Sequence, residues 1–279
     1  MERHRRELNF RQLAAQNVIL SDIPASGHAG PPFARLGRHE VLEQVGLSSW
    51  VTRYRVRDSL LDRPACVRIF RSSANKGLLE RFATAARSAS RLTHRHIEGL
   101  YDIAERDDLQ VVSEDLPYPT LDQMLTGSSE LHLSDNRAAT GLREPWPVSR
   151  ALKLIVPLTQ ALGYAHQRGV VHRQVDPRHV YIDERGEPKL AEFGVGWVLL
   201  TETPQCPEQM RASAAYFSPE AIRRDAELDE RSDIYSLGAV LYELLSGRPP
   251  FDTANLGLLL QSHITERPRA LPRETSRTP

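Results

Sequence analysis

One short stretch of the chain gathers side chains of the kinds that catalyse reactions. Residues 172–179, His-Arg-Gln-Val-Asp-Pro-Arg-His, hold imidazole, guanidinium, amide and carboxylate groups. Gln174 cannot accept a proton and so cannot act as a general base. Glu192 could ligate a cation through oxygen, whereas the imidazole of His179 suits transition metals better than Mg²⁺. Arg68 could bind a phosphate through two hydrogen bonds.

The elements that must position these side chains change in type along the chain. Short alternating or β-branched runs predict strands at Val41–Val45, Thr52–Val56, Ala65–Phe70 and Leu109–Val112. Helical spacing of apolar residues predicts helices at Leu78–Leu92, Leu121–Leu125, Ser149–Arg168, Ser232–Ser246 and Leu256–Ile264. A strand-rich front and a helix-rich back indicate an α+β fold with two lobes.

Composition excludes several classes of protein. The chain has 279 residues, 40% of them hydrophobic, and its 36 basic and 36 acidic residues cancel, so no overall field attracts nucleic acid. Cys66 and Cys206 make neither a metal motif nor a disulfide framework, which indicates a reducing, cytoplasmic setting. No apolar run approaches the roughly 18 residues of a membrane span. The basic start of the chain lacks the apolar region of a signal peptide.

Changes in composition divide the chain into three parts. Residues 1–35 are interpreted as an N-terminal arm and linker, because a short helical pattern ends in a Gly- and Pro-rich stretch. Residues 36–265 form the main domain, and the polar residues 127–147 are predicted to be a surface insertion within it. Residues 266–279, rich in Pro and Arg, are predicted to be a disordered tail.

The ordered motifs of the main domain resemble those of a known family. The segment His172–His179 is followed by Glu192-Phe193-Gly194, then by Tyr-Phe-Ser-Pro-Glu at 216–220, Ser-Asp-Ile-Tyr-Ser-Leu-Gly at 232–238 and Gly-Arg-Pro-Pro-Phe at 247–251. This succession resembles the protein kinase family, in particular bacterial-type Ser/Thr kinases. The resemblance implies a β-rich N-lobe over residues 36–113 and an α-rich C-lobe over 114–265 that lacks the family's last helices.

The positions that carry the family's chemistry hold other residues. By resemblance, Gln174 replaces the base Asp, Asp176 the catalytic-loop Lys and His179 the metal-binding Asn, while Glu192 replaces the other metal ligand. The strand Lys is replaced by Arg68, and its helix Glu partner by Ala85. No catalytic group is therefore intact, no metal is expected at His179 and Glu192, and Arg68 is expected to pair with solvent or with Glu192.

The nucleotide pocket is also altered. Gly46 matches the first glycine of the family's glycine-rich loop, whereas Ser48 and Val51 stand at the other two glycine positions. Arg53 falls where the family places an apolar residue over adenine, so it obstructs the pocket or stacks on a ligand. The resemblance assigns the pocket lining to Gly46, Cys66, Arg68, Ser113 and Leu116.

Other matching residues have structural roles in the family. His172 and Phe193 resemble members of the stacked column that joins the lobes, and Gly194 completes that motif. Asp233 resembles the buried carboxylate that accepts hydrogen bonds from the catalytic loop. Glu220 lacks its family Arg. Arg173 either makes a structural ion pair or binds a phosphorylated activation segment, for which the candidates are Thr201, Thr203 and Ser213.

These departures favour a pseudokinase, a catalytically inactive kinase-like protein with a regulatory or scaffolding role. Its expected partner is a protein that binds the C-lobe face or the N-terminal arm, and no cofactor is expected. Two alternative hypotheses remain. One is a weak atypical Ser/Thr kinase that uses ATP with Mg²⁺ or Mn²⁺ through Arg68 and Glu192, and the other is an ATP-binding sensor without phosphate transfer.

Overall fold

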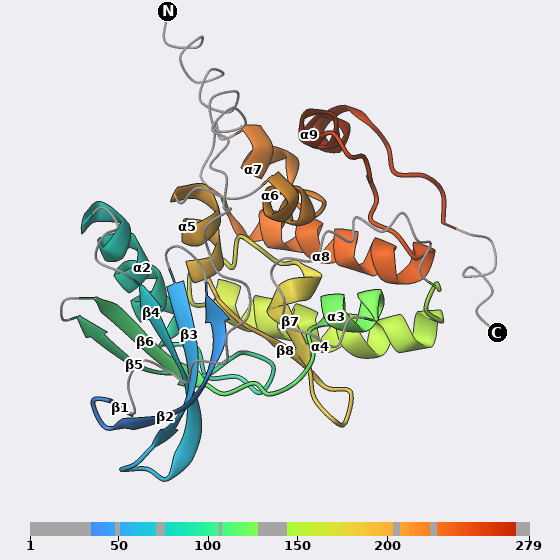
Figure 1. Ribbon diagram of the computed structural model, residues 1–279. Helices are drawn as coiled ribbons and strands as arrows, with labels where there is room; N and C mark the ends of the chain where they lie inside the picture. The colour runs from blue at the N-terminus through green and yellow to red at the C-terminus, as the bar shows by residue number, and fades with distance from the viewer. Residues whose placement is uncertain are drawn as a thin grey trace, which may run out of the picture.

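A computed structural model describes residues 35–47, 51–70, 76–105, 108–127, 144–202, 207–223 and 228–271. Its front part is a six-stranded antiparallel sheet in the order β1-β2-β3-β4-β6-β5, with helix α2 packed on it (Figure 1). The bounds of these elements are β1 Arg35–Leu36, β2 His39–Leu47, β3 Val51–Asp58, β4 Arg63–Phe70, α2 Lys76–Ala89, β5 Leu100–Glu105 and β6 Leu109–Glu114.

Alternation of side chains explains why β3 is a strand. Tyr54 and Val56 are buried on one face, whereas Arg55 and Arg57 point to the other face. This strand pairs with β4 without a bulge. The predicted strands are confirmed, and the structure adds β5, whose sequence, Leu-Tyr-Asp-Ile-Ala-Glu, has too little β-branched character to stand out.

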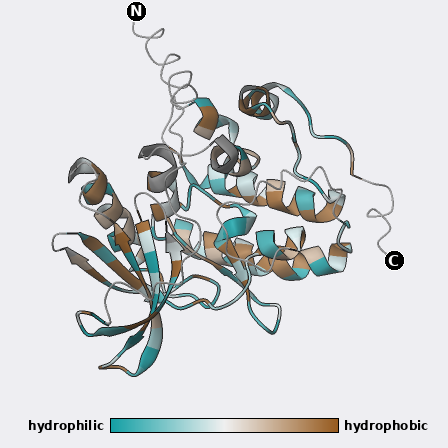
Figure 2. Cartoon of the chain, in the orientation of Figure 1, coloured by the Kyte–Doolittle hydropathy of each residue, from teal (hydrophilic) through white to brown (hydrophobic). Residues whose placement is uncertain are grey.

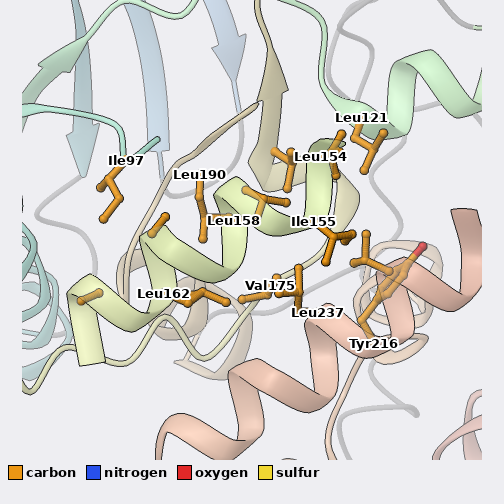
Figure 3. Close-up of a cluster of buried hydrophobic side chains, with 14 of the residues drawn as sticks. Ile97, Leu121, Leu154, Ile155, Leu158, Leu162, Val175, Leu190, Tyr216 and Leu237 are labelled. Carbon is orange, nitrogen blue, oxygen red and sulfur yellow. The ribbon is translucent and has the colours of Figure 1, made fainter. Parts of the chain in front are cut away.

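The back part of the molecule is helical. Its core lies mainly between α4 and α8, and Figure 3 shows Leu158, Leu162 and Leu237 pointing into it. The bounds of the elements are α3 Leu121–Thr126, α4 Val148–His166, η1 Pro177–His179, β7 Val180–Ile182, β8 Pro188–Leu190, α5 Val195–Glu202, α6 Pro207–Ala214, α7 Pro219–Arg223, α8 Glu230–Ser246 and α9 Leu256–Thr265. The predicted α+β fold with two lobes is confirmed.

Hydropathy and capping set the limits of these helices. Figure 2 shows hydrophobic and hydrophilic residues recurring along α4 and α8, as expected of helices with one buried face. The carboxylate of Asp229 caps α8 by accepting from Arg231 N, and Gly247, at a φ of 77°, ends it. The predicted helices at these places are confirmed, with ends shifted by a few residues.

The sequence prediction missed three short helices, α5, α6 and α7, between the Glu-Phe-Gly motif and α8. Their apolar residues serve two cores, since Val195 and Val198 of α5 pack against α2, whereas Ala214 of α6 and Ala221 of α7 pack with Leu259 of α9. No single helical face is apolar enough to be seen in the sequence.

The ends of the predicted parts differ slightly from the observed ones. Strand β1 begins at Arg35, and β6 ends at Glu114, one residue beyond the expected lobe boundary. Beyond α9, the described residues 266–271 contain no helix, yet Tyr242 Oη donates to the carbonyl of Arg269 at 2.9 Å. The N-terminal arm, most of the predicted insertion and residues 272–279 lie outside the described residues.

Candidate functional site

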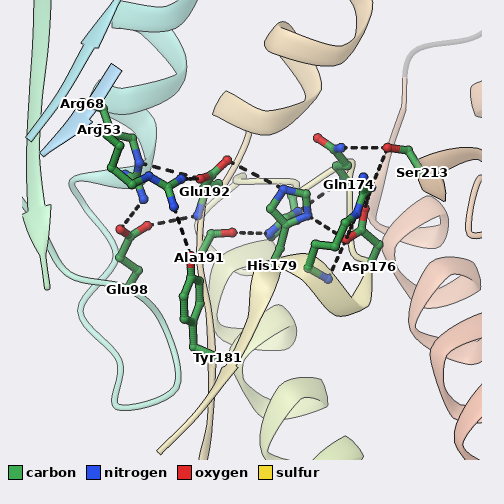
Figure 4. A network of polar contacts seen from close by, with 12 residues as sticks. Arg53, Arg68, Glu98, Gln174, Asp176, His179, Tyr181, Ala191, Glu192 and Ser213 are labelled. Atoms are coloured by element: carbon green, nitrogen blue, oxygen red, sulfur yellow. Dashed lines mark hydrogen bonds and ion pairs between the residues drawn. The ribbon is translucent and has the colours of Figure 1, made fainter. Parts of the chain in front are cut away.

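The candidate residues meet between the sheet and the helical lobe. Figure 4 shows side chains from β3 and β4 facing others from β7 and from the segments that flank β7 and β8. We call this interface between the sheet and the helical lobe the cleft. It includes Arg68, which the sequence prediction assigned to the nucleotide pocket.

Arg53, on β3, reaches across this cleft. Its Nη2 donates to Glu192 Oε1 in a short ion pair, and its Nη1 donates to the hydroxyl of Tyr181 at 3.2 Å. The Arg53 side chain is 24% exposed and that of Glu192 is 10% exposed, so the pair is largely shielded from water. Tyr181 lies on β7, so one guanidinium links the sheet to two elements of the helical lobe.

Arg68, on β4, is buried in the same cleft. Its Nη2 lies 2.5 Å from Glu98 Oε1, its Nη1 donates to Ser113 Oγ at 3.3 Å, and its Nε lies 3.7 Å from Glu192 Oε1. Of the two partners expected for Arg68, solvent or Glu192, the structure shows the ion pair with Glu192 and adds a closer one with Glu98. Its nearest carboxylate is Glu98, from the segment before β5, because Ala85 on α2 offers no acidic group.

Charge in the cleft is balanced inside the protein. Burial raises the pKa of Glu192, but the neighbouring guanidiniums of Arg53 and Arg68 lower it more, to about 2. Burial lowers the pKa of Arg68, but the Glu98 carboxylate has the opposite effect, and the pKa of Arg68 lies above its ordinary value. Glu98 Oε2 also accepts from the backbone N–H of Glu192 at 3.1 Å. Glu192 and Arg68 are therefore both charged at neutral pH.

The residue at the family's base position is held by its neighbours. The amide of Gln174 donates to Ser213 Oγ at 3.4 Å, and a Cβ on Gly196 would lie 2.5 Å from Gln174 Oε1. Arg178 also donates to Ser213 Oγ, at 2.6 Å, and forms a short ion pair with Asp176. Asp176 therefore has a structural partner, and the buried hydroxyl of Ser213 is engaged on two sides.

His179 lies between two carboxylates. Its Nδ1 is 3.1 Å from Asp176 Oδ1, and its Nε2 is 3.7 Å from Glu192 Oε2. Burial lowers the pKa of His179, but the carboxylates of Asp176 and Glu192 raise it above its ordinary value. Both ring nitrogens of His179 therefore face carboxylates of the protein itself. Among the described residues, no cluster of three or more potential metal ligands occurs.

A buried carboxylate holds the backbone of the catalytic loop, residues 172–179, by hydrogen bonds. Asp233 accepts from the backbone N–H of His172 at 2.8 Å and of Arg173 at 2.7 Å, and lies 2.7 Å from His166 Nε2. The ring of His172 contacts that of Phe193, with centroids 4.6 Å apart. Arg173, at a φ of 70°, has an exposed side chain. Thr203 lies outside the described residues, as does the side chain of Thr201.

Most of the remaining predicted positions line the edges of the cleft. Gly46 pairs with Arg53, and a Cβ on Gly46 would lie 3.5 Å from the Arg53 Cβ. A Cβ on Gly194 would lie 3.4 Å from the Ala85 Cβ, so the replaced clamp position packs against the Glu-Phe-Gly motif. Cys66 has a buried thiol and Leu116 is half-buried. Glu220 does not belong to the cleft, since it lies on α7 and accepts from Ser232 Oγ of α8 at 2.6 Å.

Three residues of the cleft were missed by sequence reasoning. Glu98 follows a short polar segment with no regular pattern, and nothing in its spacing points to Arg68. Tyr181 follows the catalytic loop closely, and its alternation with Val180 and Ile182 could have placed it on a strand facing the cleft. Arg178 could have been noticed because Asp176 needs a cation when buried.

Fold and motifs together define a protein kinase domain, and the chain belongs to the protein kinase family. A model of the protein kinase domain matches residues 40–276. Similar proteins include serine/threonine-protein kinase PrkC of Bacillus subtilis (33% identical; 84% of this chain, 34% of PrkC) and PknL of Mycobacterium tuberculosis (32%; 84% of this chain, 55% of PknL). PknB of Mycobacterium leprae is 30% identical over 83% of this chain and 36% of its own length.

The chain spans between about a third and about half the length of these curated relatives. Within the part of the chain that the structure describes, no helix has the length and apolar character needed to cross a membrane.

Proposed function

We propose that this chain is a catalytically inactive protein-kinase domain, which acts in the cytoplasm as a regulatory or scaffolding module through protein partners. The observation that carries the proposal is the pairing of Glu192 with Arg53 and Arg68. A carboxylate at the family's metal position is neutralised by two guanidiniums from the sheet.

The residues of the cleft do not fit a magnesium nucleotide. Mg²⁺ needs compact oxygen ligands, and the position that should supply an amide oxygen holds His179, whose pKa is raised. The second ligand, Glu192, has its oxygens directed to Arg53 and His179. A metal would have to displace buried ion pairs, so no step of phosphate transfer is assigned to this site.

The missing base supports the same conclusion. Gln174 has no group that can accept a proton, and loss of a general base alone lowers rates by roughly 10²–10⁴. Asp176 places a negative charge where the family has a cation, which opposes the developing charge of a transferring phosphate. The metal ligands, the base and the catalytic-loop cation of the family are all replaced. Restoring one of these groups should therefore not restore phosphate transfer.

A radiolabelled ATP transfer assay tests the proposal. Wild type and Gln174→Asp are incubated side by side with Mg²⁺ or Mn²⁺ and a protein substrate rich in Ser and Thr. We expect no incorporation above a no-protein blank in either sample. Stoichiometric labelling of the substrate by the wild type would contradict the proposal, and labelling by Gln174→Asp alone would limit the defect to the base.

One observation favours a second function, that of a weak atypical kinase. Arg68 has a buried carboxylate partner, Glu98, at 2.5 Å. The cleft therefore keeps a cation paired with an acid, although the two residues differ from the Lys and the helix Glu of the family. Thermal melting with ATP separates the cases, because a bound ligand stabilises by RT ln(1 + [L]/Kd). A metal-dependent shift with labelling favours the weak kinase, and a shift without labelling favours an ATP sensor.

A further inference from the structure

The groups that surround the Arg53 guanidinium form a binding site for a planar cation. The Glu192 carboxylate accepts from Nη2 and the Tyr181 hydroxyl accepts from Nη1. Burial lowers the pKa of Arg53, but Tyr181, Glu192, Cys66 and Glu98 raise it well above its ordinary value. A guanidinium offers donors in a fixed plane, which suits acceptors that converge from two elements.

The charges around Arg53 select against an anion. Without the Arg53 side chain, the Glu98 and Glu192 carboxylates would face the guanidinium of Arg68, with the His179 imidazole 3.7 Å from Glu192 Oε2. Both acids are largely buried, with side chains 7% and 10% exposed. Removal of the Arg53 charge would take the nearest cation from Glu192, so a replacement cation is favoured over a polyphosphate, most strongly where water is excluded.

We propose that the cleft has become a guanidinium-binding site, in which Arg53 is a ligand supplied by the chain itself. The bound side chain ties β3 of the sheet to Tyr181 and Glu192 of the helical lobe and fills the space that a nucleotide would need. This inference deepens the proposed function and rests on it, because a cleft occupied in this way cannot take up ATP.

Chemical rescue of Arg53→Ala in the full chain tests the inference. Loss of the buried partner of Glu192 should lower Tm by about 8 °C. Methylguanidinium should restore about 3 °C at ten times its Kd, with a saturating titration. Methylurea, which has a similar shape and no charge, should restore nothing. The matched control is Arg57→Ala on the same strand, where Arg57 is 55% exposed and pairs with Asp62.

Each outcome of this experiment decides the inference. If Arg53→Ala does not fold alone, recovery of its circular dichroism with methylguanidinium but not methylurea supports the site. Equal effects of the two compounds, rescue of Arg57→Ala to the same degree, or saturable stabilisation of the wild type by ATP would overturn it. If rescue fails, the prediction that the chain transfers no phosphate still stands, because a different assay tests it. The inference and the proposed function can therefore fail separately.

Discussion

Two buried carboxylates organise this molecule in different ways. Asp233 accepts hydrogen bonds from the backbone of the catalytic loop, and all its partners lie in the helical lobe. Glu192 pairs with side chains of Arg53 and Arg68, which come from the sheet. The first arrangement, which we call the Asp233 anchor, fixes a loop within one lobe. The second, the Glu192 cluster, joins two lobes.

The difference shows which parts of this kinase fold depend on particular side chains and which do not. Backbone N–H groups are present whatever the side chains are, so the Asp233 anchor does not depend on the residues at catalytic positions. The Glu192 cluster depends on each side chain, because its contacts are ion pairs between side chains. The anchor therefore preserves the loop, and the cluster determines what the cleft can hold.

The largest expected effect comes from removing the anchor. Asp233→Ala leaves two buried N–H groups and His166 without their acceptor, and should lower the free energy of unfolding by about 4 kcal/mol. Urea unfolding monitored by circular dichroism measures this loss. Asp229→Ala, which removes an exposed helix cap from the same helix, is the matched control and should cost about 1 kcal/mol. Equal losses would contradict the special role of the anchor.

Weakening the ion pair between Arg68 and Glu98 should have the next largest effect on the free energy of unfolding. Glu98→Gln leaves the buried Arg68 guanidinium with a weakened partner, and should lower the free energy of unfolding by about 3 kcal/mol. Glu43→Gln removes the acid of an exposed pair with Arg55, and should change it by less than about 0.5 kcal/mol. A loss at Glu98 no larger than at Glu43 would show that the cluster contributes nothing to stability.

Acid should weaken the Glu192 cluster in a predictable range of pH. The folded-state pKa of Glu192, about 2, lies below the ordinary value of 4.5, so its ionised form stabilises the fold above pH 4.5. This contribution, about 3 kcal/mol, is lost as pH falls from 4.5 towards 2. The gap in unfolding free energy between wild type and Glu192→Gln should therefore narrow on acidification. Parallel pH profiles would refute this assignment.

The smallest expected effect concerns the hydrogen bond of Tyr181. Tyr181→Phe removes the acceptor of Arg53 Nη1 and should lower the free energy of unfolding by about 1 kcal/mol. The hydroxyl of Tyr242 donates to the carbonyl of Arg269 in an exposed position. Tyr242→Phe should therefore lower the free energy of unfolding by about 0.5 kcal/mol or less. Differential scanning calorimetry of both variants sharpens the comparison. A stabilised Tyr181→Phe would mean that Arg53 prefers another partner.

The regular part of the fold was predictable from local patterns. Alternation identifies β3, a short apolar run identifies β4, and apolar residues at helical spacing identify α4 and α8. The strand β5 was missed because it has few β-branched residues, and the helices α5 to α7 were missed because their side chains divide between separate cores. The placing of Glu98 beside Arg68 had no local signal, because 30 residues separate them.

The sequence by itself determined which residues stand at the positions matched to the family, because the identity of Gln174 or His179 needs no coordinates. Only the tertiary structure decided which side chains meet in the cleft. Arg53 and Glu192 are 139 residues apart, and Arg53 and Tyr181 are 128 apart, so their contacts exist only when the two lobes close on one another. A buried carboxylate needs a cation, and the fold determines which arginine can reach it.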